Sequence, residues 1–380
     1  MILMAYSILI TVAWIGVTIY LLFNSRKISF LKDVPEMANG SEPSVAIIIA
    51  VKDEEAEVEE ALNSVCKLDY ANCKIIVIND RSTDQTPAIL NRIAAANPAV
   101  SIITINELPA GWLGKNHALY KGYLASSAEW LLFTDADIKY NKPALKKAMY
   151  YASANHLDHL TALPEITSRS SVFKGVMNTF SIMLEIKIRP WSVKNATSTA
   201  SLGVGAFNLV KRTAYETAGT HTAISLRPDD DLKLGERIKK AGLRSDVIYG
   251  EKEISLQWYT SLGEFVQGLM KNTFSVANYH LPTAIAMAVS TIVVFVIPLP
   301  MLLLSGKNGI CLATCLLFSQ VILMVFKKGI HGRWWHGLLI PFSGAIMAFI
   351  ILKSAFKTLQ QRGIYWRNSF YPLEELRKQR

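Results

Sequence analysis

The sequence predicts a doubly wound α/β domain with membrane helices before and after it, and three observations lead to this prediction. The 380-residue chain is 51% hydrophobic with a mean hydropathy of +0.25, which is rare for a soluble protein. Long uncharged stretches lie near its start and after residue 280. Between them, short β-branched runs alternate with segments of helical periodicity, a pattern typical of a parallel sheet covered by helices.

The first predicted element is a membrane anchor. Residues 1–23 carry no charged side chain and are long enough to span a bilayer. The basic residues Arg26 and Lys27 follow the apolar stretch instead of preceding it, so we interpret it as an uncleaved anchor and not as a signal peptide. The positive-inside rule then places the N-terminus outside and the rest of the domain in the cytoplasm, after a polar linker at 24–43.

Residues 44–280 are predicted to form the α/β domain. Runs of β-branched and aromatic residues predict four strands at 44–51, 74–80, 101–106 and 130–137. Helical periodicity connects them at 54–65, 86–96 and 115–126. Because the carboxyl ends of parallel strands meet at one edge of such a sheet, we expect the ligand to bind there.

The C-terminal part is predicted to be a membrane domain at 281–352 followed by a basic tail at 353–380. Three apolar stretches indicate three further helices, at 281–304, 309–326 and 337–352. Four crossings would leave the tail outside, yet its seven Lys or Arg against two Glu favour the cytoplasm. We therefore expect one apolar segment to be interfacial or re-entrant, in a multi-pass protein of the cell membrane.

The formal net charge of +10 has two explanations, a nucleic-acid surface or the cytoplasmic flanks of membrane helices. The basic residues lie beside the apolar stretches and nucleic-acid motifs are missing, so we expect no nucleic-acid partner. The four cysteines lack the spacing and the His partners of a zinc site, and we expect reduced thiols.

Acidic residues follow the predicted strands. In "LLFTDADI" (131–138), Asp135 and Asp137 end a buried strand, and alternation along an extended chain would point both carboxylates the same way. Two carboxylates beside a ligand crevice can hold Mg²⁺ or Mn²⁺ together with phosphate oxygens. A solvated turn is the alternative interpretation of this motif.

Two other strand ends carry acids. "NDRSTDQT" places Asp80 directly at the end of the second strand, where its side chain can reach a base or ribose, while Asp84 suits a helix cap. "AVKDEEAEV" places Asp53 and Glu55 after the first strand. Three consecutive strand ends rich in carboxylates are more than helix caps alone require.

The series "IIIAVKDEE", "VINDRSTDQT", "WLGKNHAL" and "LLFTDADI" resembles the nucleotide-sugar domain of family 2 glycosyltransferases, which have the GT-A fold. The resemblance covers residues 44–260. It implies that Asp137, with Asp135 close by, holds the metal on the donor diphosphate. It also implies a donor site that includes Asp53, Glu55, Asp80, Lys115 and Asp135.

The family resemblance also implies a catalytic base. Members carry an acidic pair before an amphipathic helix, and "RPDDDLKLGERIKKAG" (227–242) fits that description. Counting back from Leu234 assigns the base to Asp231, with Asp230 as the alternative one residue away. A simple helix cap that favours the helix dipole is the competing explanation.

The chain lacks the Q-x-x-R-W motif of processive polysaccharide synthases. "GWLGKNHAL", the three C-terminal apolar segments and the tail "WRNSFYP" instead resemble a lipid-modifying subgroup, which includes ceramide glucosyltransferase-like, hopanoid-associated and carotenoid glycosyltransferases. The resemblance implies a hexosyltransferase that moves a sugar, UDP-linked, to a membrane lipid hydroxyl with inversion. The alternatives are a polysaccharide or polyprenyl-phosphate glycosyltransferase and, from another class, a transporter or non-enzymatic membrane protein.

Overall fold

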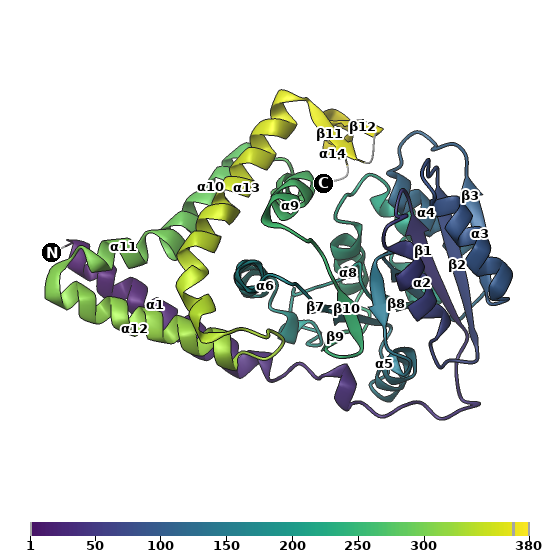
Figure 1. Cartoon of the computed structure of the whole chain (residues 1–380), viewed down its shortest axis with the longest axis horizontal. Helices are drawn as coiled ribbons and strands as arrows, with labels where there is room; N and C mark the ends of the chain where they lie inside the picture. Colours follow the sequence, from purple (N-terminus) through teal and green to yellow (C-terminus); the bar gives the residue numbers. More distant parts are fainter. Residues whose placement is uncertain (1, 367–368, 379–380) are drawn as a thin grey trace.

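The computed structural model describes residues 2–366 and 369–378, and it places an α/β domain beside a group of apolar helices (Figure 1). The domain is built around a seven-stranded sheet with the strand order β3-β2-β1-β4-β8-β6-β9. The strands are β1 Val45–Val51, β2 Cys73–Asp80, β3 Val100–Ile105, β4 Trp130–Thr134, β6 His159–Leu163, β8 Asn208–Lys211 and β9 Ser245–Tyr249. The four predicted strands are confirmed, although β4 ends at Thr134 and not at residue 137.

The sheet is mixed, whereas the sequence predicts parallel strands. The neighbours β3, β2, β1 and β4 are parallel, but β8 runs antiparallel between β4 and β6. Strand β8 follows the loop that carries Gly203 and Gly205, and this loop lies at the carboxyl end of β4. The chain therefore enters β8 from that edge of the sheet, which fixes its direction.

Helices cover both faces of the sheet, as predicted. In β1, Ile47 and Ile49 pack into the cluster that contains α2 and α3, while Ile48 packs into the cluster of α4 and α8. This alternation is the period-two pattern of a strand that is buried on both sides. The helices on the first face are α2 Val58–Cys66, α3 Thr86–Ala96 and α5 Ala144–Ala154, and those on the second are α4 Gly114–Leu124, α7 Arg212–Thr217 and α8 Asp230–Lys240.

Smaller elements join this domain to the apolar helices. A three-stranded sheet has the order β5-β10-β7, with β5 Ile138–Tyr140, β7 Glu165–Ile166 and β10 Ile254–Leu256. Two helices, α6 Ser171–Ile188 and α9 Leu262–Val276, lie between the large sheet and the long helix α13 (Figure 1). Short 3₁₀ turns occur at η1 Leu31–Asp33, η2 Pro190–Ser192, η3 His221–Ile224 and η5 Trp334–Leu339.

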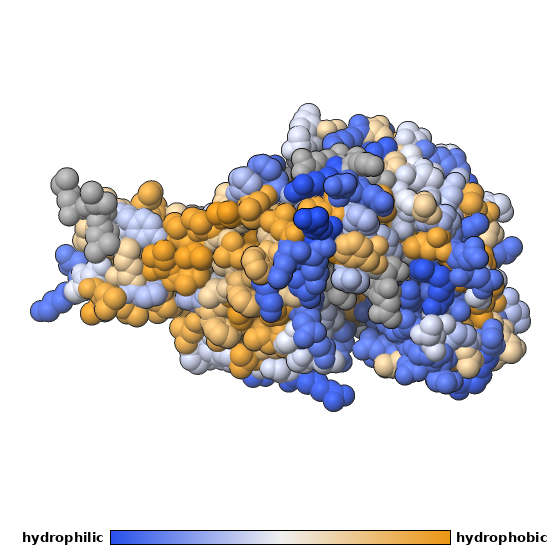
Figure 2. Space-filling view, turned by 90° about the horizontal axis from the view of Figure 1, so that it is seen from above, coloured by the Kyte–Doolittle hydropathy of each residue, from blue (hydrophilic) through white to orange (hydrophobic). Residues whose placement is uncertain are grey.

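Three helical stretches in the described part of the chain are long and apolar enough to cross a membrane: Met4–Ser25, Gly306–Phe326 and Trp334–Gln360. They belong to α1 Ile2–Ser25, α12 Gly306–Phe326 and α13 Ile340–Gln360 with η5 before it. The predicted helix 281–304 is bent, because α10 Leu281–Thr291 passes through the π-helical turn η4 Ile292–Val296 into α11 Pro298–Leu303. Figure 2 shows apolar side chains concentrated over this half of the molecule.

The segment after α13 is folded as well. An antiparallel hairpin of β11 Gly363–Trp366 and β12 Ser369–Pro372 precedes a last helix, α14 Leu373–Lys378. The hairpin lies close to the α/β domain (Figure 1). Residues Arg367 and Asn368 of the "WRNSFYP" motif lie outside the described residues.

The close packing of α4 on the sheet leads to a prediction about stability. Gly122 lies in α4, and a Cβ atom at this position would overlap with the side chains of Ile48 and Ile78. We expect Gly122→Ala to lower the free energy of unfolding by about 1–3 kcal/mol, as overpacking does. Thermal unfolding of the detergent-solubilised protein measures this change.

Gly263→Ala is the matched control, because the nearest atom to a Cβ there is Ser261 Oγ at 3.9 Å. Equal unfolding temperatures for the two variants would contradict the predicted packing of α4.

Candidate active site

The candidate active site lies beyond the carboxyl end of β4. Several separate parts of the chain contribute side chains to one hollow at this place, including the start of α4, the turn after β4, the loop before β8 and the start of α8. The polar residues that line it are Lys115, Thr134, Asp135, Asn208, His221, Asp230 and Asp231. The structure thus brings together four of the predicted site residues, Lys115, Asp135, Asp230 and Asp231.

Asp135 is held by the loop before β8. Its backbone N–H donates a hydrogen bond to the carbonyl oxygen of Gly205 at 3.0 Å, just after the end of β4. A Cβ atom at position 205 would overlap with the Asp135 carboxylate, so this close approach requires glycine. The expectation that Asp135 and Asp137 lie on one extended strand is wrong, because β4 ends at Thr134 and a turn follows.

The three consecutive aspartates at the start of α8 have different partners. Asp229 accepts two hydrogen bonds from the Arg227 guanidinium, from Nε at 2.8 Å and from Nη2 at 2.7 Å. Asp230 lies 3.5 Å from Lys115 Nζ and 3.8 Å from His221 Nε2.

Asp231, in contrast, accepts hydrogen bonds from backbone N–H groups, those of Gly205 and Leu232, each at 2.8 Å. Within the described part of the chain, no Lys, Arg or His lies within ion-pair distance of Asp231. Of the three aspartates, Asp231 is therefore the one that has no direct cationic partner.

Lys115 is the cation around which the acids gather. Its Nζ atom lies 2.7 Å from Asp135 Oδ1 and 3.5 Å from Asp230 Oδ1. Burial by itself would lower the pKa of Lys115, but the charges of Asp135, Asp230 and Asp231 outweigh burial and raise it. The lysine therefore stays charged and compensates for part of the negative charge in the site.

Because one lysine cannot neutralise several carboxylates, their pKa values separate. Burial raises the pKa of Asp231 to about 7, and the negative charge of Asp230 adds to this effect. Burial would also raise the pKa of Asp230, but its contacts with Lys115 and His221 outweigh burial and lower it. Adjacent carboxylates whose pKa values are driven apart are typical of sites in which one of them exchanges a proton.

Asp137 lies in the turn after β4 and is not among the residues that line the hollow. Burial raises its pKa to about 7, and the charges of Asp135 and Glu54 add to the shift. In the described part of the chain, no three His, Cys, Asp or Glu side chains form a metal cluster. A magnesium-type site needs one or two carboxylates when phosphate oxygens complete it, so Asp135 and Asp137 fit a cation that arrives with a diphosphate.

Asp80 lies at the end of β2 and is paired with its neighbour. Arg81 donates to both carboxylate oxygens, from Nε at 2.8 Å and from Nη2 at 3.1 Å. Gly114, at the start of α4, approaches so closely that a Cβ atom there would overlap with the Asp80 carboxylate. Asp80 is thus placed beside the residue that precedes Lys115, at the same edge of the sheet.

Asp53 and Glu55 connect the loops after β1 and β2. Asp53 Oδ1 accepts from the backbone N–H of Thr83 at 2.7 Å, and Glu55 Oε2 accepts from that of Gln85 at 2.9 Å. In this arrangement both side chains hold the loop after β2 in place. They are not among the residues that line the hollow around Asp231.

Sequence reasoning missed His221 and Arg227. His221 is buried, its Nδ1 lies 2.6 Å from Tyr215 Oη, and burial lowers its pKa. Arg227 is also buried, and its guanidinium pairs with the Asp229 carboxylate. The carboxylates of the next two aspartates are not engaged by this arginine. Arg227 lies within the "RPDDD" stretch, so an arginine two residues before the first acid was a usable signal, but nothing local indicated His221.

Comparison with known proteins shows what the chain is similar to. Residues 46–217 match the family model described as "Glycosyl transferase family 2". The chain is 24% identical over 224 residues to a 4,4'-diaponeurosporenoate glycosyltransferase of Staphylococcus aureus (strain MRSA252), covering 58% of each chain. It is 26% identical over 224 residues to a poly-beta-1,6-N-acetyl-D-glucosamine synthase of Staphylococcus aureus (strain COL), covering 57% of this chain and 51% of the relative. The chain therefore spans little more than half the length of these curated relatives.

A solved structure shares the fold over nearly the whole chain. It is the mannosyltransferase PcManGT from Pyrobaculum calidifontis in complex with GDP-Man and Mn²⁺, with a TM-score of 0.56 and 16% sequence identity. The match covers 95% of this chain and 99% of that one. Residues 46–217 thus match the model of the family 2 glycosyltransferases, and the chain shares the GT-A fold of this mannosyltransferase.

Proposed function

We propose that the enzyme transfers a sugar from a nucleotide-sugar donor, UDP-linked, to a hydroxyl group of a membrane lipid, with inversion at the anomeric carbon. The observation that carries the proposal is the difference between the three aspartates of α8. Asp229 and Asp230 have cationic partners, whereas Asp231 accepts from backbone N–H groups and has its pKa raised to about 7. A carboxylate with these properties is suited to take a proton at neutral pH.

The donor is held at the carboxyl edge of the sheet in this proposal. Asp80 contacts the nucleoside, Asp53 and Glu55 support the loops around it, and Lys115 approaches the phosphates. Asp137 and Asp135 hold Mg²⁺ or Mn²⁺ on the diphosphate. When bound, such a cation stabilises the negative charge of the leaving diphosphate.

The transfer itself is a single displacement. The acceptor oxygen forms a bond with the anomeric carbon while the bond from that carbon to the phosphate oxygen breaks. Asp231 takes the proton of the attacking hydroxyl, and the nucleoside diphosphate leaves with the bonding electron pair. One base is enough for this reaction, unlike the two carboxylates of glycoside hydrolases.

A lipid acceptor is supported by the neighbouring apolar helices. A catalytic domain on the cytoplasmic side, next to membrane helices, suits an acceptor that stays in the bilayer. The carotenoid-lipid name of one relative favours a lipid, and the polysaccharide name of another favours a polymer as the second candidate. Product size separates the two.

The first prediction concerns the base. With membranes, a radiolabelled UDP-sugar and Mn²⁺, we expect a lipid-extractable product that is one sugar heavier than its acceptor by mass spectrometry. Asp231→Asn keeps the size of the side chain but cannot accept a proton, so transfer should fall by about 10²–10⁴-fold. Donor affinity should stay within a few-fold, because the donor contacts are made by other residues.

Asp230→Asn should have a milder effect, and Glu236→Gln serves as the matched control on the same helix. Glu236 pairs with Lys233 and Lys240 away from the hollow, so its variant should keep full activity. Near-normal turnover of Asp231→Asn would contradict the assignment of the base. A long-chain product would favour the polysaccharide alternative.

The second prediction concerns the metal. We expect donor binding to require Mn²⁺ or Mg²⁺ and to be lost in Asp137→Ala, because in this proposal Asp137 and Asp135 hold the cation on the diphosphate. Calorimetric titration of UDP with and without excess EDTA measures this. Glu60→Gln is the control, since this acid pairs with Lys139 on the surface. Equal affinity in EDTA would rule out the metal.

The third prediction concerns pH. The pKa of Asp231 is raised to about 7 by burial and by Asp230, so its deprotonated fraction and the transfer rate should rise between about pH 6 and pH 8. The folded state binds this proton more tightly than the unfolded chain, whose Asp pKa is about 3.9. The ionised carboxylate therefore destabilises the fold above about pH 7, and this effect disappears as the pH falls towards about 4.

Asp231→Asn should accordingly unfold at a higher temperature than the wild type at about pH 8 and at a similar temperature near pH 4. Thermal unfolding at the two pH values measures this difference without an activity assay. A variant that is less stable than the wild type at pH 8 would contradict a raised pKa.

A further inference from the structure

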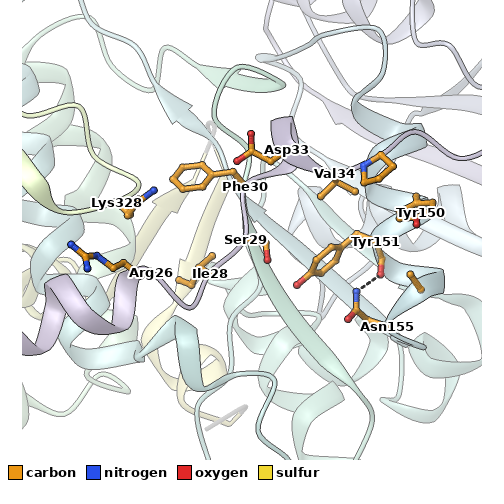
Figure 3. A pocket seen from close by; sticks show the side chains of 12 residues that line it. Arg26, Ile28, Ser29, Phe30, Asp33, Val34, Tyr150, Tyr151, Asn155 and Lys328 are labelled. Carbon is orange, nitrogen blue, oxygen red and sulfur yellow. Dashed lines mark hydrogen bonds between the residues drawn. The ribbon is translucent and has the colours of Figure 1, made fainter.

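The ends of α1 and α12 lie together. The two helices run side by side in the same direction, and Thr18 Oγ1 lies 3.4 Å from the Ser319 carbonyl oxygen near the end of each (Figure 1). The residues just after them, Arg26 and Lys328, line the same hollow of about 390 Å³ (Figure 3). If α1 crosses a bilayer, the chain leaves α12 at the same surface at which it leaves α1.

The segment after α12 rests on the catalytic domain. The buried Lys327 Nζ donates to Glu185 Oε1 of α6 at 2.8 Å. A Cβ atom at Gly329 would overlap with the ring of Tyr249, the last residue of β9. Residues 327–329 are therefore on the same side of a bilayer as the catalytic domain.

The start of the following apolar segment is tied to that side as well. His336 Nε2 lies 3.2 Å from Ser171 Oγ at the beginning of α6. A Cβ atom at Gly175, one turn further along α6, would lie 2.8 Å from Leu339 Cδ1. In its second half, α13 contacts α9, where Ser354 Oγ donates to the Met270 carbonyl oxygen at 2.6 Å.

The segment that follows α13 packs against the catalytic domain. Its hairpin and α14 bury Tyr371 and Leu376 in a cluster with Leu113, which precedes α4, and Leu226, which precedes the three aspartates. Arg377 Nη2 also donates to the Tyr279 carbonyl oxygen at 3.1 Å. Both ends of α13 are therefore attached to one and the same domain.

From these contacts we infer that α13 does not cross the bilayer but lies along its surface, on the side of the catalytic domain, with its exposed apolar face against the lipid. A helix whose two ends are on one side makes no net crossing. The bent segment α10–α11 then enters the bilayer and α12 returns, so that, with α1, the described part of the chain crosses three times. The basic tail stays on the catalytic side, in agreement with its charge.

The exposed face of α13 suits this position. Phe342, Phe349 and Phe356 recur every seven residues and are 51%, 53% and 68% exposed. Lys353 Nζ lies 5.0 Å from the centroid of the Phe349 ring, and Lys357 is also exposed.

Aromatic side chains with lysines beside them are typical of helices in the interface plane, where the charged groups reach the headgroups. In a crossing helix, Lys353 would lie well inside the segment Trp334–Gln360. Composition and length alone admit a crossing, but the contacts at both ends do not.

This inference goes beyond the proposed reaction. It depends on attachment to the membrane but not on the donor, the base or the acceptor. Its partner is the lipid surface next to the active site. The test therefore measures on which side of the bilayer single residues lie and how deep the face of α13 is. Both quantities can be measured whatever the substrate of the enzyme is.

The first experiment maps the side of single cysteines in the full chain. The design first removes the four native cysteines by replacing Cys66, Cys73, Cys311 and Cys315 with Ala. Each variant then carries one new cysteine at an exposed position: Ser41→Cys, Lys307→Cys, His331→Cys or Gln361→Cys. In intact cells, a membrane-impermeant maleimide should label the variant at 307 and should label those at 41, 331 and 361 only after permeabilisation. Opposite sides for 331 and 361 would overturn the inference, because α13 would then cross.

If the cysteine at position 307 were labelled from the same side as the cysteine at position 331, the proposed crossings of α10–α11 and α12 would be overturned. A different outcome concerns only the orientation. If the cysteines at positions 41, 331 and 361 were all labelled from outside, the cytoplasmic orientation in the proposed function would fail, but the inference about α13 would stand. The two claims are therefore separable.

The second experiment measures depth. Spin labels are attached at Phe342→Cys, Phe349→Cys and Phe356→Cys, and the proteins are placed in proteoliposomes. The accessibility of each label to oxygen and to a nickel complex gives its depth in the bilayer. We expect all three labels to lie at similar, shallow depths. A steady change of depth along the three positions, passing through the bilayer centre, would overturn the inference. Gly16→Cys in α1, where a Cβ meets no atom within 4 Å, provides the reference for a deep site.

Discussion

The site is governed by an excess of negative charge around one lysine. Asp135 and Asp230 both lie within ion-pair distance of Lys115, and Asp231 is close enough for its charge to affect the same lysine. In a partly buried place, water cannot screen these charges as it does at the surface. The acids therefore compete for the cation, and Asp231, which has no direct cationic partner, has its pKa raised, as the proposed base requires.

Glycine makes this crowding possible. Side chains at Gly203 and Gly205 would overlap with the backbone of Asp231 and with the carboxylate of Asp135, respectively, and a Cβ atom at Gly235 would overlap with the backbone of the same loop. The loop before β8 can therefore lie directly between β4 and α8. Its Gly205 backbone N–H donates a hydrogen bond to the Asp231 carboxylate. The same loop also sets the antiparallel direction of β8.

The sequence predicts those features that depend on local patterns. Residues 44–134 show strand and helix periods that agree closely with the observed elements, because both faces of the sheet are buried and the pattern is strong. The acids at the strand ends follow from the same pattern. The role of His221, the partners of Asp229 and the direction of β8 depend on contacts between distant segments, which no local period encodes. The position of α13 is of the same kind, since hydropathy indicates that a helix is apolar but not which domain holds its ends.

The cluster that joins the C-terminal segment to the catalytic domain has a consequence for biogenesis. Leu113 lies just before the helix that carries Lys115, and Leu226 lies just before the aspartates of α8; both are covered by residues that follow all of the apolar segments in the chain. A ribosome makes those covering residues after the apolar helices. The segments that precede Lys115 and the aspartates are therefore covered only after α10, α11, α12 and α13 have been synthesised, and a shorter nascent chain lacks this cover. The support of these two segments thus depends on residues that follow the apolar helices in the chain.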